Sequence, residues 1–100
     1  MQPDMAGFPS VYSLDDLREF VHQTLCAKEN LLPDQSPVTE MPLTRAGRVC
    51  GVQFHVRGPR AVRLSAIWAA DLNVVYFYDA CGTRYLKVQL RYRFGMAAAA

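Results

Sequence analysis

The sequence predicts an α+β fold, in which one N-terminal helix packs on a four- to five-stranded antiparallel β-meander. The first observation is that apolar residues recur at helical spacing through residues 13–29. The second is that apolar and polar residues alternate from residue 48 to residue 94, with turn sequences between the alternating runs. Because an amphipathic sheet buries its apolar face against another element, we expect the helix to cover one face of the sheet.

The predicted helix at 13–29 has a start signal and an apolar stripe. Ser13 is suited to the N-cap position, and Asp16 stands three residues later, where a capping box places an acidic side chain. The stripe that should face the sheet consists of Leu14, Leu17, Val21 and Leu25.

The remaining segments divide a single small domain, residues 1–100. Residues 1–12 are expected to be a flexible N-terminal segment, and residues 95–100 a frayed tail. Residues 30–47 contain three prolines and form a connection, in which Val38 to Arg45 can make a short edge strand because an edge tolerates Pro42. The alternating region, residues 48–94, is the meander.

Length and composition limit the class of protein. One hundred residues make one domain, and 51% apolar residues exclude a disordered chain. No run reaches the roughly 20 apolar residues of a membrane helix, and the N-terminus lacks the basic start and apolar core of a signal peptide. Three cysteines without a close pair fit a reducing compartment. We therefore expect a cytoplasmic protein without membrane contact.

The strand registers can be predicted by requiring apolar positions to share one face. Loops of three residues at 58–60, 70–72 and 80–82 meet this requirement. They place an apolar patch at the centre of the outer face, away from the helix: Ile67, Val75, Phe77 and Tyr85. They surround it with a basic rim: Arg57, Arg63, Lys87, Arg91 and Arg93. A two-residue loop at Asp71-Leu72 would instead reverse the faces of the following strand and place Tyr76 and Tyr78 outside.

An exposed apolar patch with a polar rim is typical of an interface. Three occupants are considered: a second copy in a homodimer, residues 1–12 folded over the patch, and a foreign protein partner. Met5, Phe8, Val11 and Tyr12 are the apolar residues that the N-terminal segment would contribute.

Charge is divided along the chain. Residues 1–44 carry seven acidic and two basic residues, a net charge of −5, whereas residues 45–100 carry two acidic and nine basic residues, a net charge of +7. One interpretation is that the acidic helix and the basic sheet attract each other. The other is a basic surface for an anionic partner.

Catalytic chemistry has little support in the sequence. The registers place His55, Arg63 and Asp79 in one row across three strands, but no nucleophile accompanies the histidine, and a cross-strand salt bridge is the preferred interpretation. Asp79 also suits the first position of a turn, where its carboxylate can accept a backbone N–H. We expect no catalytic residue, no cofactor and no metal site.

Two functional hypotheses follow. The first is a non-enzymatic interaction module that self-associates through the outer face, centred on the apolar patch. The alternative is single-stranded nucleic-acid binding, with Phe77 and Tyr85 stacking on bases and Arg63, Lys87 and Arg91 holding phosphates. The stretch "RLSAIWAADLNVVYFYDACGTRYLKVQL" resembles short bacterial proteins of unknown function, a resemblance that extends loosely over residues 13–90 and implies no activity.

Overall fold

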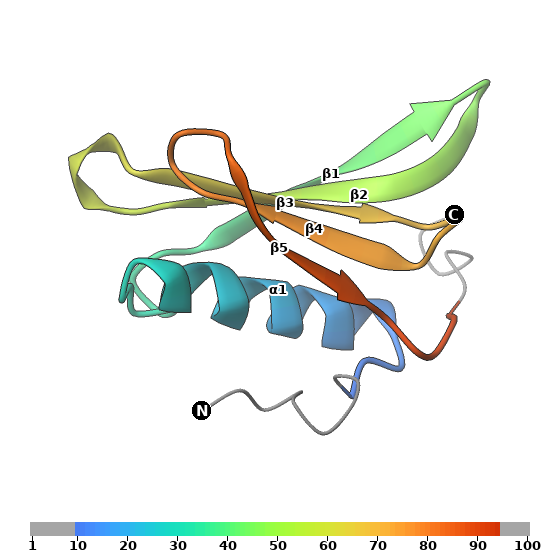
Figure 1. Cartoon of the computed structure of the whole chain (residues 1–100), viewed down its shortest axis with the longest axis horizontal. Helices are drawn as coiled ribbons and strands as arrows, with labels where there is room; N and C mark the ends of the chain where they lie inside the picture. Colours follow the sequence, from blue (N-terminus) through green and yellow to red (C-terminus); the bar gives the residue numbers. More distant parts are fainter. Residues whose placement is uncertain (1–9, 95–100) are drawn as a thin grey trace.

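The computed structural model describes residues 10–94 as one helix and one five-stranded antiparallel sheet. The elements are α1 (Leu14–Lys28), β1 (Val38–Arg45), β2 (Arg48–Arg57), β3 (Arg63–Ala69), β4 (Val74–Tyr78) and β5 (Arg84–Gln89). The strands lie in the order in which they occur in the chain, and α1 covers one face of the sheet (Figure 1). The predicted α+β meander with its N-terminal helix is confirmed, and the proline-containing edge strand forms as β1.

Helix α1 begins where the capping signal places it. The Ser13 hydroxyl oxygen accepts a hydrogen bond from the Asp16 backbone N–H at 3.1 Å. The Asp16 carboxylate in turn accepts from the Tyr12 backbone N–H at 3.0 Å, one residue before the position that a regular capping box would use. The helix ends before Asn30, whose φ of 56° lies in the left-handed region that asparagine tolerates.

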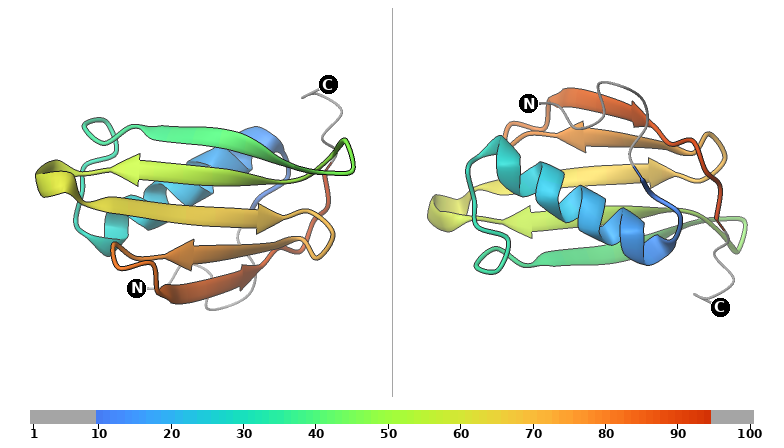
Figure 2. Two further views of the ribbon diagram at one scale, coloured as in Figure 1. Left: turned by 90° about the horizontal axis from the view of Figure 1, so that it is seen from above. Right: turned by 90° about the horizontal axis from the view of Figure 1, so that it is seen from below.

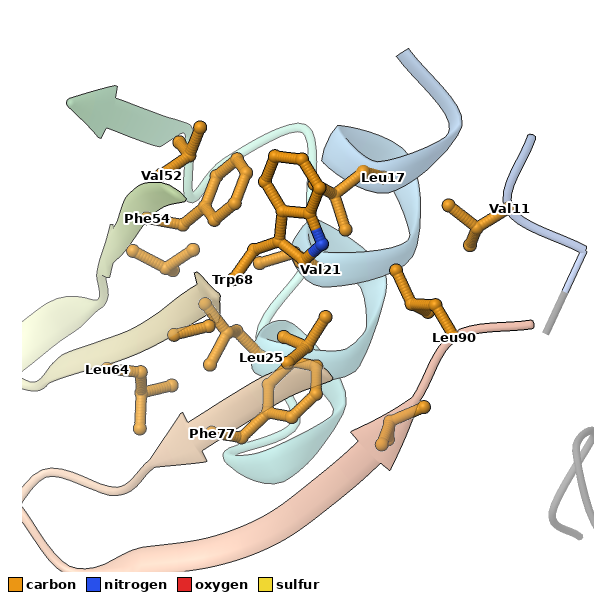
Figure 3. Packing of buried hydrophobic residues seen from close by; sticks show 14 of the residues in the cluster. Val11, Leu17, Val21, Leu25, Val52, Phe54, Leu64, Trp68, Phe77 and Leu90 are labelled. Carbon is orange, nitrogen blue, oxygen red and sulfur yellow. The ribbon is translucent and has the colours of Figure 1, made fainter. Parts of the chain in front are cut away.

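The hydrophobic core lies between α1 and the covered, or inner, face of the sheet (Figure 3). Leu17, Val21 and Leu25 are fully buried, and they lie over the large side chains that the strands contribute. Burial of each such side chain contributes roughly 1.5–3 kcal/mol to the free energy of folding. The stripe predicted from helical spacing is therefore the stripe that packs.

The N-terminal and C-terminal ends of the described chain also join this core. Val11 is 2% exposed and packs with the core cluster, so residues 10–12 do not fold over the outer face. The Tyr12 ring packs against the Tyr92 ring at a tilt of 37°, with ring centroids 4.6 Å apart. The rest of the predicted flexible segment, including Met5 and Phe8, and the predicted tail at 95–100 lie outside the described residues.

The predicted faces of β4 are wrong. Trp68 pairs with Val75, and Ala70 and Asn73 enclose a two-residue turn made by Asp71 and Leu72. This register is the alternative considered from the sequence. It turns Val75 and Phe77 toward α1, where both are fully buried, and turns Tyr76 and Tyr78 outward.

Asn73 supplies the physical reason for the two-residue turn. Its φ of 55° closes the turn in the left-handed region, and its side chain is 2% exposed. The side-chain oxygen accepts from Trp68 Nε1 at 3.0 Å, while the amide nitrogen donates to the Tyr92 carbonyl at 2.9 Å. These contacts tie the turn to the core and to the chain after β5, so the turn length is fixed by tertiary contacts.

The predicted place of Tyr85 is also wrong, because β5 contains a bulge. Phe77 pairs with Leu86 and Tyr78 pairs with Arg84, which leaves Tyr85 as an extra residue on β5. Its ring packs against the core, with its centroid 6.3 Å from that of Phe77. The extra residue thus moves Tyr85 to the inner face, while Lys87 stays on the outer face.

The two edge strands are irregular, whereas the central pairs are regular. The β1–β2 register shifts between Leu43 and Thr44, opposite the extra residue Cys50, and β1 also contains Pro42. Neighbouring Gly51 is required there, because a Cβ atom at this position would lie 2.2 Å from the Trp68 carbonyl oxygen. The β2–β3 register differs from the predicted one by two residues, which leaves the faces of both strands as predicted.

Candidate functional site

The sheet face opposite α1, called the outer face below, is the candidate site. Seen from above, the strands lie in front of the helix, and no described helix or loop crosses them (Figure 2). Strand alternation and the observed registers define its residues as Thr39, Met41, Leu43, Arg45, Arg48, Gly51, Gln53, His55, Arg57, Arg63, Ser65, Ile67, Ala69, Val74, Tyr76, Tyr78, Arg84, Lys87 and Gln89.

The outer face carries charge of one sign. Every charged residue of the described strands that points outward is cationic: Arg45, Arg48, Arg57, Arg63, Arg84 and Lys87. The inner face has a single charged strand residue within the described chain, Glu40, which binds Arg18 of α1 with Nε–Oε1 at 2.6 Å. The charge division seen along the sequence is therefore a division between the two sides of the molecule.

Two arginine pairs stand directly opposite each other across neighbouring strands. Arg57 pairs with Arg63 at one end of β2, and Arg48 pairs with Arg45 at the other end. Opposed like charges destabilise a sheet. Within residues 10–94, the ion pairs that form both involve Arg18, so neither arginine pair has a carboxylate of the described chain within ion-pair distance.

A cleft of about 390 Å³ opens beside the Arg57–Arg63 pair. Its lining consists of Pro37, Thr39, His55, Val56, Arg57 and Arg63. The His55 ring lies next to Gln53, with 3.4 Å between the two Nε2 atoms. The cleft therefore offers guanidinium, imidazole and hydroxyl groups together, a donor set that suits an anion.

The middle of the outer face is apolar and aromatic. Ile67, Tyr76 and Tyr78 are partly exposed, and Met41 on β1 is 51% exposed. The Arg84 guanidinium carbon lies 5.1 Å from the centroid of the Tyr76 ring, a cation–π contact. Met41 and Ile67 flank the middle of β2 between the two arginine pairs, whereas the tyrosines lie farther across the sheet on β4.

A second, smaller cleft of about 240 Å³ lies near the Arg45–Arg48 pair. Its walls include the apolar side chains of Leu43, Ile67 and Leu72, together with Arg45. Leu72 is 58% exposed at the β3–β4 turn. The lining of the first cleft therefore carries more polar groups than that of the second, although apolar surface predominates in both.

The predicted interface residues do not form one surface. Ile67 lies on the outer face as predicted, but Val75, Phe77 and Tyr85 belong to the inner face, so their predicted place in an exposed patch is wrong. A run of five consecutive apolar residues on β4 gave no alternation from which its faces could be read.

The predicted basic rim is retained in part. Arg57, Arg63 and Lys87 lie on the outer face. Arg93 instead donates to the carbonyl oxygens of Ala70 and Asp71, at 3.2 and 3.1 Å, and Arg91 follows the end of β5 as an exposed residue. Sequence reasoning omitted Arg84 from the rim and Met41 from the apolar centre, since both depended on the strand registers.

The predicted row of His55, Arg63 and Asp79 does not form. His55 pairs with Ser65, and Arg63 pairs with Arg57. Asp79 accepts hydrogen bonds from the backbone N–H groups of Cys81 and Thr83, both at 2.9 Å, as predicted for the first residue of a turn. The register, in which Tyr78 pairs with Ser65, keeps Asp79 and Arg63 out of one row, and no ion pair joins them in the described chain.

Other chemistry is sparse in the described part of the chain. Residues 10–94 contain no group of three His, Cys, Asp or Glu side chains placed to hold a metal ion. The three cysteines are free, and burial raises the pKa of the Cys26 thiol, which lowers its reactivity. No helix in the same range has the length and apolar character needed to cross a membrane.

Comparison with known proteins gives no match: no protein-family model, curated protein or solved structure is similar to this chain.

Proposed function

We propose that the protein is a non-enzymatic binding module that holds single-stranded nucleic acid on the outer face of its sheet. The observation that carries the proposal is that two pairs of arginines stand opposite each other in the strand register, one pair at each end of β2. Opposed like charges destabilise a sheet, and an anionic ligand that spans both pairs would relieve the repulsion. An extended polyanion has the required form.

The dimensions of the face suit a strand of nucleic acid. Arg48 and Arg57 are the two ends of the ten-residue strand β2. At about 3.3 Å per residue they stand roughly 30 Å apart. A single strand laid along β2 would place phosphates near both arginine pairs and bases over the centre between them.

The centre of the face suits bases. Tyr76 and Tyr78 present partly exposed rings, and Gln53, His55 and Ser65 present hydrogen-bonding groups beside them. Stacking on an aromatic ring contributes about 1–3 kcal/mol per base and tolerates any base. The tyrosines take the role that the sequence-based hypothesis assigned to Phe77 and Tyr85.

Self-association through the same face has weaker support. Of its predicted centre, Ile67 remains on the outer face, and a two-fold pairing of identical faces would bring arginines and Lys87 of one copy toward the same cations of the other. Light scattering distinguishes the two hypotheses, because a dimer built on this face would have twice the monomer mass. Replacement of Tyr76 or Ile67 by aspartate would then return the protein to the monomer mass. The three free thiols fit a reducing cytoplasmic location for either.

The direct test is fluorescence anisotropy with a labelled single-stranded thymidine 20-mer at several salt concentrations. Affinity should fall with salt, with a log–log slope of about −0.7 per phosphate contacted, so four contacts give about −3. Tyr76→Ala should weaken binding roughly tenfold or more through lost stacking. Lys28→Gln, which removes one cation from the helix side, is the matched control and should leave affinity within about twofold.

Two outcomes would overturn the proposal. One is that no salt-dependent binding to thymidine or adenosine strands occurs at 50 mM salt. The other is that polyglutamate competes as well as the oligonucleotide and that Tyr76→Ala has no effect, which would indicate an acidic protein as the partner of the cationic face.

A further inference from the structure

The cleft beside Arg57 and Arg63 has features that go beyond general attraction to a polyanion. Its polar groups come from three strands: Thr39 from β1, His55 and Arg57 from β2, and Arg63 from β3. Both guanidinium groups are exposed to it, and no ion pair involves either of them among the described residues. A binding group in this cleft therefore meets two uncompensated positive charges at close range.

The cleft also has a defined position, at the border of the sheet. Arg57 and Arg63 are the last and first residues of β2 and β3, and the chain leaves the sheet between them through a turn at Pro59–Ala61. Arg60 and Ala61 in this turn have left-handed φ values of 60° and 62°. A nucleic-acid strand lying along β2 would reach this border with one of its ends.

From these two features we infer that the Arg57–Arg63 cleft is a phosphomonoester site, which takes the terminal phosphate of a bound single strand. A phosphomonoester carries about −1.5 to −2 charges at neutral pH, against −1 for a phosphodiester inside the strand. Two guanidinium groups match the larger charge, and each can donate two parallel hydrogen bonds to phosphate oxygens. His55 and Thr39 add donors on the β1 side of the cleft.

The inference rests on the proposed function, but it makes a separate claim about one end of the ligand. It predicts that a terminal phosphate strengthens binding, whereas a general cationic surface would respond only to the number of internal phosphates. It also assigns the effect to one arginine pair and not to the cations elsewhere on the face.

The test is calorimetric titration with three thymidine decamers of equal length, carrying a 5′-phosphate, a 3′-phosphate or hydroxyl groups at both ends. One phosphorylated decamer should bind about tenfold more tightly than the decamer without phosphate. Arg63→Gln should remove this difference. Arg84→Gln, which removes an outer-face cation from outside the cleft, is the matched control and should weaken all three decamers while leaving the difference in place.

Three results would overturn the inference. The first is equal affinity for all three decamers, and the second is a phosphate-dependent difference that survives in Arg63→Gln. If no decamer binds, the proposed function fails. NMR titration with inorganic phosphate then tests whether the cleft binds phosphate by itself. In that experiment the Nε–Hε signals of Arg57 and Arg63 should shift on titration, and their failure to shift would exclude the site.

Discussion

The two faces of this sheet are built from the same strands and yet follow different rules. On β4, Phe77 is fully buried against α1, while the adjacent Tyr76 is partly exposed among cations. The inner face is apolar, and its one described strand charge, Glu40, is paired with Arg18. The outer face combines aromatic rings with opposed arginines. Packing explains the inner face, whereas the opposed arginines of the outer face contribute no packing and are instead the basis of the proposed binding role.

The largest expected effect compares neighbours on β4. Phe77→Ala should reduce the free energy of unfolding by about 3–5 kcal/mol, because it leaves a cavity beneath α1. Tyr76→Ala should reduce the free energy of unfolding by less than about 1 kcal/mol, because the tyrosine ring that it removes is only partly buried. Urea denaturation measures both. If Phe77→Ala does not fold, Phe77→Leu should still cost about 1 kcal/mol, and equal losses at positions 76 and 77 would contradict the assignment of faces.

The next effect concerns the turn that decides these faces. Asn73→Ala should reduce stability by about 2–3 kcal/mol, because Trp68 Nε1 and the Tyr92 carbonyl lose their buried partner. Asn30→Ala is the matched control: Asn30 has the same left-handed φ but is exposed at the end of α1, and its loss should be about 1 kcal/mol. Equal losses in urea denaturation would mean that the side-chain network of Asn73 contributes little.

A smaller change of opposite sign is expected at Tyr85. Its hydroxyl oxygen is buried without a hydrogen-bond partner within the described chain, so Tyr85→Phe should raise the free energy of unfolding by about 1 kcal/mol at pH 7. Tyr78→Phe on the outer face is the control and should change stability very little. Urea midpoints provide the measurement, and a loss of stability in Tyr85→Phe would show that the hydroxyl has a partner.

The same variant has a pH signature. Burial, with smaller contributions from Asp79 and Glu29, raises the pKa of Tyr85 from 10.0 to about 12. The folded state therefore favours the neutral phenol. The resulting contribution to the free energy of unfolding is fully present below about pH 10 and is lost as the pH rises toward 12. Between pH 10 and pH 12 the free energy of unfolding should fall more for the wild-type protein than for Tyr85→Phe, which lacks the phenol hydroxyl. Parallel declines would contradict the raised pKa.

The smallest effect tests the one charge of the inner face. Glu40→Gln removes the negative charge and one of the two acceptor oxygens that bind Arg18, at 2.6 and 3.0 Å, between side chains that are 40% and 33% exposed. We expect a loss of about 0.5 kcal/mol at low salt and almost none in 1 M NaCl, because exposed ion pairs are weak and screened. Glu19→Gln on α1, the helix that carries Arg18, is the control. A loss above about 2 kcal/mol would show that Glu40 is far less solvated than its exposure indicates.

Local signals in the sequence were sufficient for the helix and for the edge strand. Ser13 and Asp16 specify the start of α1 through contacts within four residues, and Pro42 identifies β1 as an edge. Alternation on β2 and β3 also predicted their faces, and with them the outward positions of Arg57 and Arg63. These features depend on short-range chemistry, which a single sequence displays.

The faces of β4 and the position of Tyr85 depended on contacts that the sequence does not display. Asn73 selects the two-residue turn through bonds to Trp68 and Tyr92, residues that lie on either side of it in the chain. The bulge on β5 adds one residue without any glycine or proline to mark it. A shift of one residue exchanges the faces of a strand, and so the aromatic centre of the candidate site could not be predicted correctly.

The irregular edges of the sheet have a consequence for how the protein meets other chains. An uncapped edge is a template for strand addition, and repeated addition is the route to fibrils. Here Pro42 and the register shift on β1, and the bulge with its neighbouring cations on β5, interrupt that template at both borders. The addition of further strands is therefore hindered at both borders, while the outer face stays uncovered by other described elements.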